Sequence, residues 1–297
     1  MVSSHLTPVI IAGATGSGKS SLALSMALKF DGEIICADSR QFYRFMQIGT
    51  ASPNEEERAL IPHHGFNIVD PLSKKVDAGF FVTFALTAIA RCHEQRKRPI
   101  TVGGTGLYLR ALRYGLNDVP QSDKTIASSL EKECNERGLA AMYEELATID
   151  PSSMRLIMPN DRYRVLRALE IYRKTKTLPS ALRTSFSLKK PVIHAHWLLK
   201  HGEMENYEAG LRARVIRMIE KGLIEEACHL RTLLPAHHWA FNVMGYEEAL
   251  KYADGIYNKE ELIEKIFIRH RQYAKRQRTW FKRESYAWQI FGAKKEK

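Results

Sequence analysis

The sequence predicts an α/β protein in which a parallel sheet is flanked by helices and interrupted by an inserted all-helical domain. Three observations support this: strand and helix patterns alternate through the first 115 residues, a glycine-rich loop joins the first strand to the first helix, and strand patterns disappear from about residue 117 to residue 190. The composition agrees, because 44% hydrophobic and 26% charged residues in a chain of 297 are typical of a packed globular protein. No apolar stretch approaches the roughly 18 residues of a membrane span, so we expect a soluble, cytoplasmic protein.

The first part of the chain has the pattern of βαβ units. Short apolar runs predict buried strands, and segments with helical periodicity separate them. In chain order we expect a strand at 9–12, a helix at 19–29, a strand at 33–37, a helix at 80–96 and a strand at 99–102. Strands connected in this way lie parallel, and ligands bind at their carboxyl ends.

The middle of the chain is predicted to be helical. Helices are expected at 130–137, 139–148 and 161–176, and the segment 192–199 is expected to return to the sheet as a strand. From Tyr207 onward the pattern is again helical, ending in a long helix at 265–283. We therefore divide the chain into a first part of the core (1–116), a helical insertion (117–190) and a second part of the core with a basic C-terminal helix (191–297).

Positive charge is concentrated in the C-terminal helix. Of the formal net charge of +12, residues 265–297 carry +9 and the rest of the chain about +3. An apolar and aromatic face of this helix is expected to be core, and two basic rows flank it: Arg271, Lys275, Arg278 and Lys282 form one, and Lys265, Arg269, Arg276 and Arg283 the other. This pattern is typical of a protein that binds a polyanion such as nucleic acid, although exposed basic helices also occur in proteins that bind none.

Cysteines and histidines give little sign of a metal site. The four cysteines lie far apart without a Cys-x-x-Cys pair, which argues against a zinc ribbon or a disulfide scaffold and favours buried thiols. The pairs at 63–64 and 237–238 lack ligand-like partners at helpful spacing, and His194 with His196 is more typical of structural histidines on one face of a strand.

The strongest motif is a G-x-x-x-x-G-K-S loop, which makes the fold P-loop NTPase-like. Its backbone N–H groups can converge on phosphate oxygens at a helix N-terminus, Lys19 can neutralise them, and the Ser20 hydroxyl suits Mg²⁺. The predicted phosphate-binding residues are Gly13, Ala14, Thr15, Gly16, Ser17, Gly18, Lys19 and Ser20.

Two further loops follow predicted strands and can face the same ligand. Asp38 ends the second strand, where a carboxylate can hold Mg²⁺ through water, act as a general base, or only cap the segment after it. Gln41 carries an amide able to pair with an adenine edge. The glycines around Thr105 indicate either a turn required by packing or a close approach of backbone and hydroxyl to a ligand. On the insertion helix, a basic face is either solvated or contacts phosphates.

Together these motifs resemble the bacterial tRNA dimethylallyltransferases, also called tRNA isopentenyltransferases. The resemblance covers most of the chain: the P-loop, Asp38-Ser39-Arg40-Gln41-Phe42-Tyr43, Ile48-Gly49-Thr50-Ala51, Pro62-His63-His64, the segment 102–112, Asn160-Asp161, Arg167-Ala168-Leu169-Glu170, Gly245-Tyr246-Glu247, Gln272-Tyr273-Ala274-Lys275-Arg276-Gln277 and Thr279-Trp280-Phe281. It implies transfer of a dimethylallyl group from dimethylallyl diphosphate to N6 of the adenosine immediately 3′ of the anticodon, with Mg²⁺ and release of diphosphate.

The resemblance also implies roles for individual residues. Asp38 would be the base, with Lys19, Thr105 and Arg214 completing the catalytic set, and Arg214 would join the P-loop in binding diphosphate. The insertion and the basic helix would hold the anticodon stem-loop of the tRNA. The implied tRNA-binding residues are Asp38, Ser39, Arg40, Gln41, Thr105, Tyr163, Arg164, Arg167, Arg271, Lys275, Arg276 and Arg278.

The chain departs from the family pattern in places. Ala14, Gly16 and Ser20 replace common Pro, Ala and Thr without removing a phosphate donor or the hydroxyl, and Met204, Gly210 and His270 stand where the family has two arginines and a threonine. We expect a monomer. The alternatives are a small-molecule P-loop kinase, a prenyltransferase of free adenine nucleotides, and an RNA-binding protein that uses nucleotide as a switch; the two small-molecule enzymes leave the basic tail unexplained.

Overall fold

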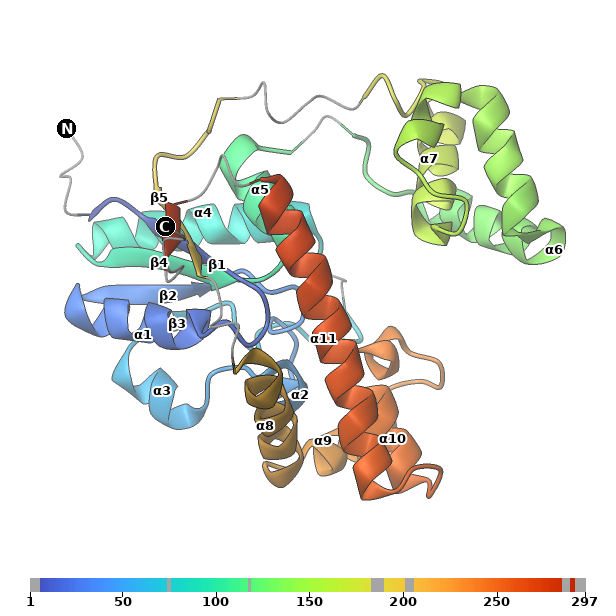
Figure 1. The fold of residues 1–297 in the computed structure, drawn as a ribbon. Helices are drawn as coiled ribbons and strands as arrows, with labels where there is room; N and C mark the ends of the chain where they lie inside the picture. Colours follow the sequence, from blue (N-terminus) through green and yellow to red (C-terminus); the bar gives the residue numbers. More distant parts are fainter. Residues whose placement is uncertain are drawn as a thin grey trace, which may run out of the picture. The chain divides into compact units, whose positions relative to one another are not determined.

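The computed structural model describes residues 6–73, 76–116, 119–182, 190–200 and 206–284, together with the backbone of 289–291. Met204 and the last three lysines lie outside the described residues. The chain divides into two compact units, one formed by Met1–Arg113 with Val192–Lys297 and the other by Tyr114–Pro191 (Figure 1). Every helix in the described part of the chain is too short or too polar to cross a lipid bilayer.

The first unit is built on a parallel six-stranded sheet of order β3-β2-β4-β1-β5-β6. The strands are β1 (Val9–Ala12), β2 (Gly32–Cys36), β3 (His63–His64), β4 (Arg98–Gly103), β5 (His196–Lys200) and β6 (Gln289–Phe291). This confirms the predicted α/β class and three predicted strands. The strands β3 and β6 were not predicted, because two or three residues are too few to show a pattern.

The prediction of a strand over 192–199 is wrong in its first half. The ladder with β1 begins only where Val9 is paired with His196, because the residue before Val9 is Pro8, which accepts from the His196 N–H but has no N–H of its own to extend the ladder. Val192 instead donates its N–H to the carbonyl oxygen of Arg113 at 2.7 Å. His194 therefore lies outside the strand, and the proposed shared face with His196 does not exist.

Helices cover both faces of the sheet. In Figure 1, α1 (Lys19–Lys29) and α4 (Ala78–Glu94) lie on opposite sides of β2 and β4. The predicted helix at 80–96 begins two residues earlier than expected, because the Asp77 side chain caps it by accepting from the Phe80 N–H. The remaining helices of this unit are α2 (Gln47–Thr50), α3 (Glu55–Leu60), α5 (Gly106–Tyr114), α8 (Tyr207–Glu220), α9 (Leu223–Leu233), α10 (Tyr246–Ala253) and α11 (Lys259–Arg283).

The long helix α11 starts six residues before the predicted position. Asn258 and Glu261 form a capping box there, which fixes the N-terminus at Lys259. The helix packs against α8 and α10. Of the expected apolar and aromatic face, Ile266, Phe267, Ala274 and Phe281 are buried, whereas Tyr273 and Trp280 are only partly buried. The buried stripe also contains two polar residues, His270 and Gln277, which are 3% and 6% exposed.

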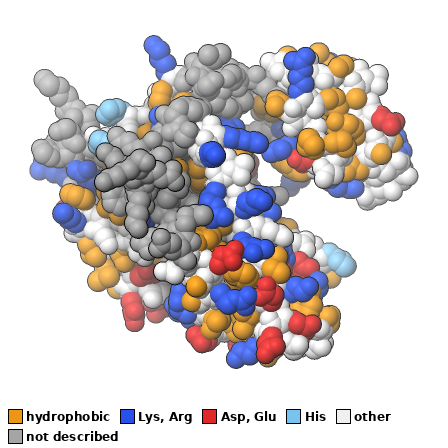
Figure 2. Space-filling view, viewed as in Figure 1, with side chains coloured by type: hydrophobic (Ala, Val, Ile, Leu, Met, Phe, Trp, Pro, Cys, Tyr) orange, Lys and Arg blue, Asp and Glu red, His pale blue; other side chains and the backbone are white. Residues whose placement is uncertain are grey.

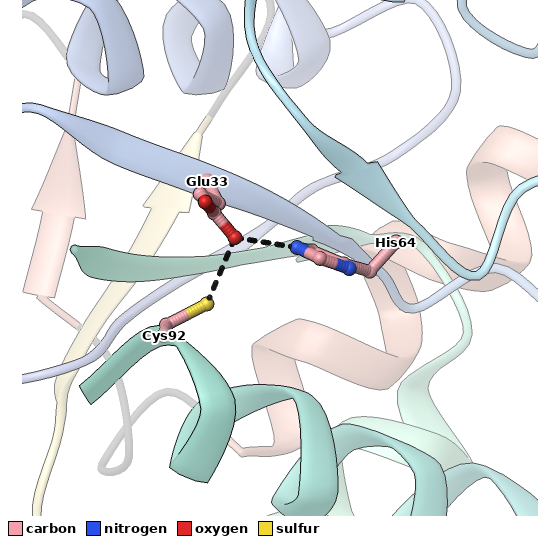
Figure 3. A group of neighbouring side chains, drawn as sticks. All are labelled: Glu33, His64 and Cys92. Carbon is pink, nitrogen blue, oxygen red and sulfur yellow. Dashed lines mark hydrogen bonds and ion pairs between the residues drawn. The ribbon is translucent and has the colours of Figure 1, made fainter. Parts of the chain in front are cut away.

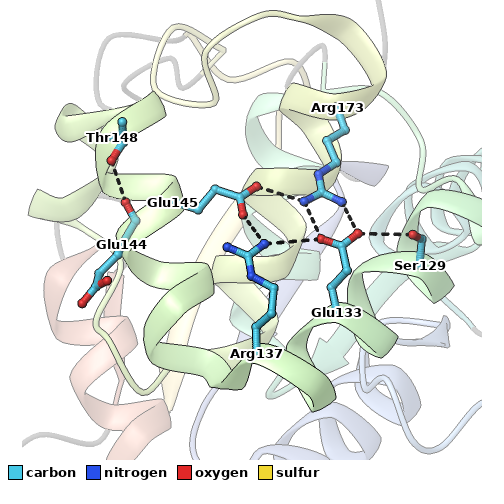
Figure 4. A network of polar contacts seen from close by, with 7 residues as sticks. All are labelled: Ser129, Glu133, Arg137, Glu144, Glu145, Thr148 and Arg173. Carbon is cyan, nitrogen blue, oxygen red and sulfur yellow. Dashed lines mark hydrogen bonds and ion pairs between the residues drawn. The ribbon is translucent and has the colours of Figure 1, made fainter.

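The second unit is helical and has its own core. Its helices are α6 (Lys124–Ile149), a 3₁₀ turn (Pro151–Arg155) and α7 (Arg162–Thr175). Gly138, at φ 81°, interrupts α6 where two separate helices were predicted. Arg173 joins the elements by ion pairs to Glu133 and Glu145, which Arg137 also contacts (Figure 4).

Candidate active site

A cavity of about 710 Å³ lies in the first unit at the carboxyl ends of β1, β2 and β4. The P-loop, the loop after β2, α8 and α11 all contribute to its lining. Seven of the lining residues are basic and two are acidic. The cavity therefore suits an anionic ligand, and the side chains that carry the argument are Thr15, Lys19, Ser20, Asp38, Ser39, Arg40, Gln41, Arg214, His270 and Gln277.

The glycine-rich loop leads from β1 into the N-terminus of α1. Gly18 is the residue before the helix and has φ 80°, a left-handed conformation that a side chain disfavours. Ser20 lies in the first turn of α1 with an exposed side chain, and Ser17 and Ala14 are buried. The first-turn N–H groups of a helix have no partners within the helix and attract anions.

Two side chains from the second part of the core hold this loop at Thr15. The Gln277 amide accepts from the Thr15 N–H at 2.8 Å and donates to the Gly104 carbonyl oxygen at 2.9 Å. The Tyr207 hydroxyl donates to the Thr15 carbonyl oxygen at 2.6 Å. The loop is thus fixed to α11 and α8, and sequence reasoning missed both anchors.

Lys19, Arg214 and Asp38 form the charged centre of the cavity. Burial, and after it the charge of Arg214, lower the pKa of Lys19 to about 8, while the charge of Asp38 opposes the change. Burial also lowers the pKa of the Arg214 guanidinium, and the negative charge of Asp38 opposes this change. Three of the four predicted catalytic residues, from α1, from α8 and from the loop after β2, are therefore brought together. Two cations with one carboxylate leave a net positive charge for a ligand to neutralise.

Thr105 holds the loop that carries Asp38. Its hydroxyl oxygen accepts from the Ser39 N–H at 3.0 Å, while one Asp38 carboxylate oxygen accepts from the Arg40 N–H at 2.9 Å. The contact between Asp38 and the Arg40 N–H is the capping arrangement that the sequence offered as one possible role for Asp38. In the described part of the chain, no hydrogen bond reaches the other carboxylate oxygen of Asp38, Oδ2, which leaves it available to accept a proton.

Gln41 and Arg40 are both engaged within the protein. The Gln41 Nε2 donates to the carbonyl oxygens of Thr50 and Ala51 at 3.0 and 2.9 Å, so both amide hydrogens are used. Arg40 lies over the Trp239 ring, 5.0 Å from its centre. In this structure Gln41 positions the segment 47–51 at the rim of the cavity, and its adenine contact stays a prediction.

Two of the sequence motifs, the segments 48–51 and 245–247, meet at the Glu226 carboxylate. It accepts from the N–H groups of Gln47, Ile48 and Gly49 at 2.8–3.0 Å, and from the Tyr246 hydroxyl at 2.6 Å. A Cβ atom on Gly49 would lie 2.4 Å from the Tyr246 ring. These residues therefore fix the wall of the cavity rather than contact a ligand.

The basic residues predicted to bind nucleic acid are only partly free. In Figure 2, Lys and Arg side chains gather along the course of α11. There Lys275 and Arg276 are exposed, Arg271 pairs with Glu208 at 3.3 Å, and Arg278 lies over the Tyr207 ring at 4.8 Å.

The insertion shows the same mixture. Tyr163 is 75% exposed, and Arg164 pairs with Asp161 at 3.0 Å. Arg167 pairs with Glu170 at 2.7 Å and donates to the Pro120 carbonyl oxygen, so its guanidinium is held within the unit. Tyr163 and Arg164 are the more accessible of the three.

Glu33, His64 and Cys92 form a cluster that sequence spacing did not reveal (Figure 3). The His64 Nε2 is 2.6 Å from the Glu33 carboxylate, and the Cys92 thiol donates to the same oxygen at 3.5 Å. Burial, and after it the charge of Glu33, raise the pKa of this thiol to about 12. The His64 ring and the protonated Cys92 thiol both form hydrogen bonds with the Glu33 carboxylate, so the cluster is explained as structural.

Comparison with known proteins identifies the relatives of this chain. Residues 41–284 match the family model described as IPP transferase. The chain is 39% identical over 276 residues to the tRNA dimethylallyltransferase of Anaeromyxobacter sp. strain K, covering 93% of this chain and 90% of the relative. It is 41% identical over 278 residues to that of Geobacter metallireducens, with the same coverage.

Solved structures agree with the sequence relatives. The full-length tRNA isopentenylpyrophosphate transferase of Bacillus halodurans aligns with a TM-score of 0.67 at 34% identity, over 96% of this chain and 89% of that one. A eukaryotic dimethylallyltransferase described as acting on tRNA aligns with a TM-score of 0.76 at 32% identity, over 92% of this chain and 69% of the other.

Proposed function

The chain belongs to the IPP transferase family, and we infer that it transfers a dimethylallyl group from dimethylallyl diphosphate to N6 of the adenosine immediately 3′ of the anticodon in tRNA, releasing diphosphate. The observation that carries the assignment within this chain is the grouping of Lys19, Arg214 and Asp38 in one cavity at the P-loop. The small-molecule kinase considered from the sequence gains no support, because the relatives are named as tRNA-modifying transferases.

The diphosphate of the donor is proposed to occupy the P-loop. As the bond between its oxygen and C1 of the dimethylallyl group breaks, the electron pair stays on that oxygen and its negative charge rises. Lys19, Arg214 and the N–H groups of the loop are placed to stabilise this charge in a partly buried site, where electrostatic interactions are stronger than in water. The anchors at Thr15 keep these donors in position before substrate binds.

Asp38 is proposed to accept the proton that N6 loses. The N6 lone pair forms the new bond to C1, and the proton passes to the free carboxylate oxygen. The Arg40 N–H and the contact between Thr105 and Ser39 hold the carboxylate in one orientation. General base catalysis of this kind contributes about 10²- to 10⁴-fold.

Magnesium is proposed as the cofactor, and the residues present fit it. The Ser20 hydroxyl lies in the first turn of α1 and lines the cavity together with Lys19, and oxygen is the donor that Mg²⁺ prefers. When bound, the ion would neutralise part of the charge on the diphosphate. Ser20 would hold it from the protein side.

The anticodon stem-loop is the proposed nucleic-acid partner. The exposed basic residues of α11 and the exposed Tyr163 and Arg164 of the insertion offer the charge and aromatic surface for phosphate and base contacts. The target adenosine must leave the stack of the loop to reach Asp38. A single protein chain is proposed to be sufficient for this.

The test is prenyl transfer measured with the full chain. Labelled dimethylallyl diphosphate and an unmodified tRNA transcript should yield prenylated tRNA without ATP. Asp38→Asn should lower kcat by about 10²- to 10⁴-fold while tRNA affinity changes little. Asp31→Asn is the matched control, because Asp31 is an exposed carboxylate at φ 50°, which asparagine tolerates. Transfer of the ATP γ-phosphate, or equal loss of turnover and binding in Asp38→Asn, would overturn the assignment.

A further inference from the structure

One side of α8 carries three basic residues along the cavity, which we call the α8 row. Arg214, Arg217 and Lys221, the residue that ends the helix, are three and four positions apart, which places them on the same side of it. All three line the cavity that contains the P-loop. At a rise of about 1.5 Å per residue, the row is about 10 Å long. It is therefore an extended strip of positive charge beside the anion site.

The α8 row leads from solvent toward the P-loop. Its inner end is Arg214, which is partly buried and whose charge, after burial, lowers the pKa of Lys19. Burial lowers the pKa of Arg214 as well, Asp38 opposes the change, and the charge of Arg217 adds to it. Arg217 and Lys221 are exposed. Because they are exposed and also line the cavity, they lie where it opens to solvent.

The two exposed cations lack a counter-charge among the described residues. Neither the Arg217 guanidinium nor the Lys221 ammonium forms a hydrogen bond or an ion pair there. By contrast, Arg212, on another side of the same helix, pairs with Glu264. A helix C-terminus favours a cation on any of its sides, so the helix dipole does not explain why both residues line the cavity. Their charge is available to an anionic ligand at the opening.

Charge of one sign at the opening of a cleft attracts a ligand of the opposite sign. Such a field increases association rates by about 10- to 10³-fold, and salt weakens it because the screening length is only about 8 Å at 0.15 M. A folded stem-loop is too large to follow the α8 row into a cavity of about 710 Å³. A small molecule with several negative charges can follow it and reach Lys19. An alkyl diphosphate, the donor proposed above, has this size and charge.

We propose that the Arg217 and Lys221 side chains form the entry path of the donor, attracting the diphosphate of dimethylallyl diphosphate to the opening of the cavity, from which it reaches the P-loop. This inference rests on the proposed function, because it concerns the donor of the same reaction. The two residues act on the rate at which the donor binds. They make no contact with the diphosphate once it occupies the P-loop, and they take no part in the chemical step.

The experiment measures the association of a dansyl-labelled alkyl diphosphate with the full chain, in the presence of Mg²⁺, by stopped-flow fluorescence. The Gln double variant, Arg217→Gln with Lys221→Gln, should lower the association rate constant about three- to tenfold at about 0.1 M salt. The dissociation rate constant should change by less than about twofold. At about 1 M salt, where the screening length is about 3 Å, the parent chain and the Gln double variant should associate at the same rate.

Two further variants separate charge from other effects. The exchange variant, Arg217→Lys with Lys221→Arg, keeps both charges, so it should associate as fast as the parent chain within about twofold. Arg212→Gln is the matched control, because it removes a charge from the same helix on a side that does not line the cavity. It should also associate as the parent chain does. Thermal unfolding of each variant shows that it is folded.

Equal association rates for the parent chain and the Gln double variant would overturn the proposal. Faster dissociation with unchanged association would also overturn it, since the residues would then hold the bound diphosphate instead of attracting it. If the exchange variant associates as slowly as the Gln double variant, hydrogen-bond geometry and not charge is responsible, and the entry path is excluded. An equal loss in Arg212→Gln would exclude it as well, because any cation of the helix would then suffice.

A second measurement uses the tRNA transcript. If the α8 row contacted two phosphates of the tRNA, the Gln double variant would reduce the slope of log affinity for tRNA against log salt by about 1.8. That change, with unchanged association of the labelled diphosphate, would overturn the proposal. If the parent chain associates with the diphosphate in this charge-dependent way but does not prenylate tRNA, the proposed function fails while the entry path stands. The two hypotheses are therefore separable.

Discussion

Replacing Gln277 with methionine tests the anchoring of the P-loop. Methionine has nearly the same length and no hydrogen-bonding amide, so the change keeps the volume on the buried face of α11. It leaves the Thr15 N–H and the Gly104 carbonyl oxygen without their partner. Each unpaired buried group costs about 1–3 kcal/mol, and for the two groups we expect a total loss of about 2–6 kcal/mol in the free energy of unfolding.

The measurement is urea unfolding followed by circular dichroism, together with calorimetric binding of inorganic diphosphate. Gln272→Met is the matched control, because Gln272 belongs to the same motif and the same helix but is exposed. It should change stability by less than about 0.5 kcal/mol. Diphosphate binding should weaken only in Gln277→Met, since the Thr15 segment is then free to move.

The reasoning is refuted if the two variants are equally stable and bind diphosphate equally. A loss of stability without any loss of diphosphate affinity would restrict the role of Gln277 to joining α11 to the loop after β4. If Gln277→Met binds diphosphate with wild-type affinity but transfers the prenyl group more slowly, Gln277 affects the alignment of the bound donor and not the position of the loop.

Three further predictions follow from the structure. Gly106→Ala should destabilise the protein by about 1–3 kcal/mol, because a Cβ atom would lie 2.2 Å from the indole nitrogen of Trp280 on α11. Gly210→Ala, with open space around it in α8, should instead stabilise the protein by about 0.5–1 kcal/mol. Thermal unfolding that gives the same sign for both variants would contradict this. Arg173→Gln should lower stability by about 1 kcal/mol at pH 7 in urea unfolding. The hydrogen bond from Arg173 lowers the pKa of the Glu133 carboxyl below its usual 4.5. The stabilisation by this ion pair is therefore present above pH 4.5 and disappears as the pH falls through the lowered pKa. A difference in stability that is unchanged at about pH 3 would exclude the ion pair. Lys275→Gln should reduce the slope of log affinity for tRNA against log salt by about 0.9, and an unchanged slope would exclude a phosphate contact.

The elements that the sequence predicted well are those with local patterns. The P-loop needs only eight consecutive residues and their flanking strand and helix, and the break at Gly138 is visible from one glycine between two helical patterns. The start of β5 could not be predicted, because it depends on where β1, nearly 190 residues earlier, begins to offer partners.

Residues of the site that act across long sequence distances were missed for a similar reason. His270 and Gln277 lie at helical spacing with the apolar residues of α11, so a polar residue within a predicted buried stripe was the available signal. The charge pattern of this helix indicated only the two basic rows as functional and gave no sign of a role for its buried stripe. The partner of Gln277 is 262 residues away along the chain, which no periodicity can reveal.

The fixing of Thr15 from both sides also sets the order in which the site can be completed during synthesis. The loop itself is among the first segments to leave the ribosome, whereas Tyr207 and Gln277 follow only after the whole helical unit has been made. Until then the nascent chain carries a glycine-rich segment without its anchors, next to a sheet that still lacks β5 and β6. The competent anion site is therefore a property of the finished chain, and a truncated product that ends within the insertion retains the motif but not the geometry that makes it useful.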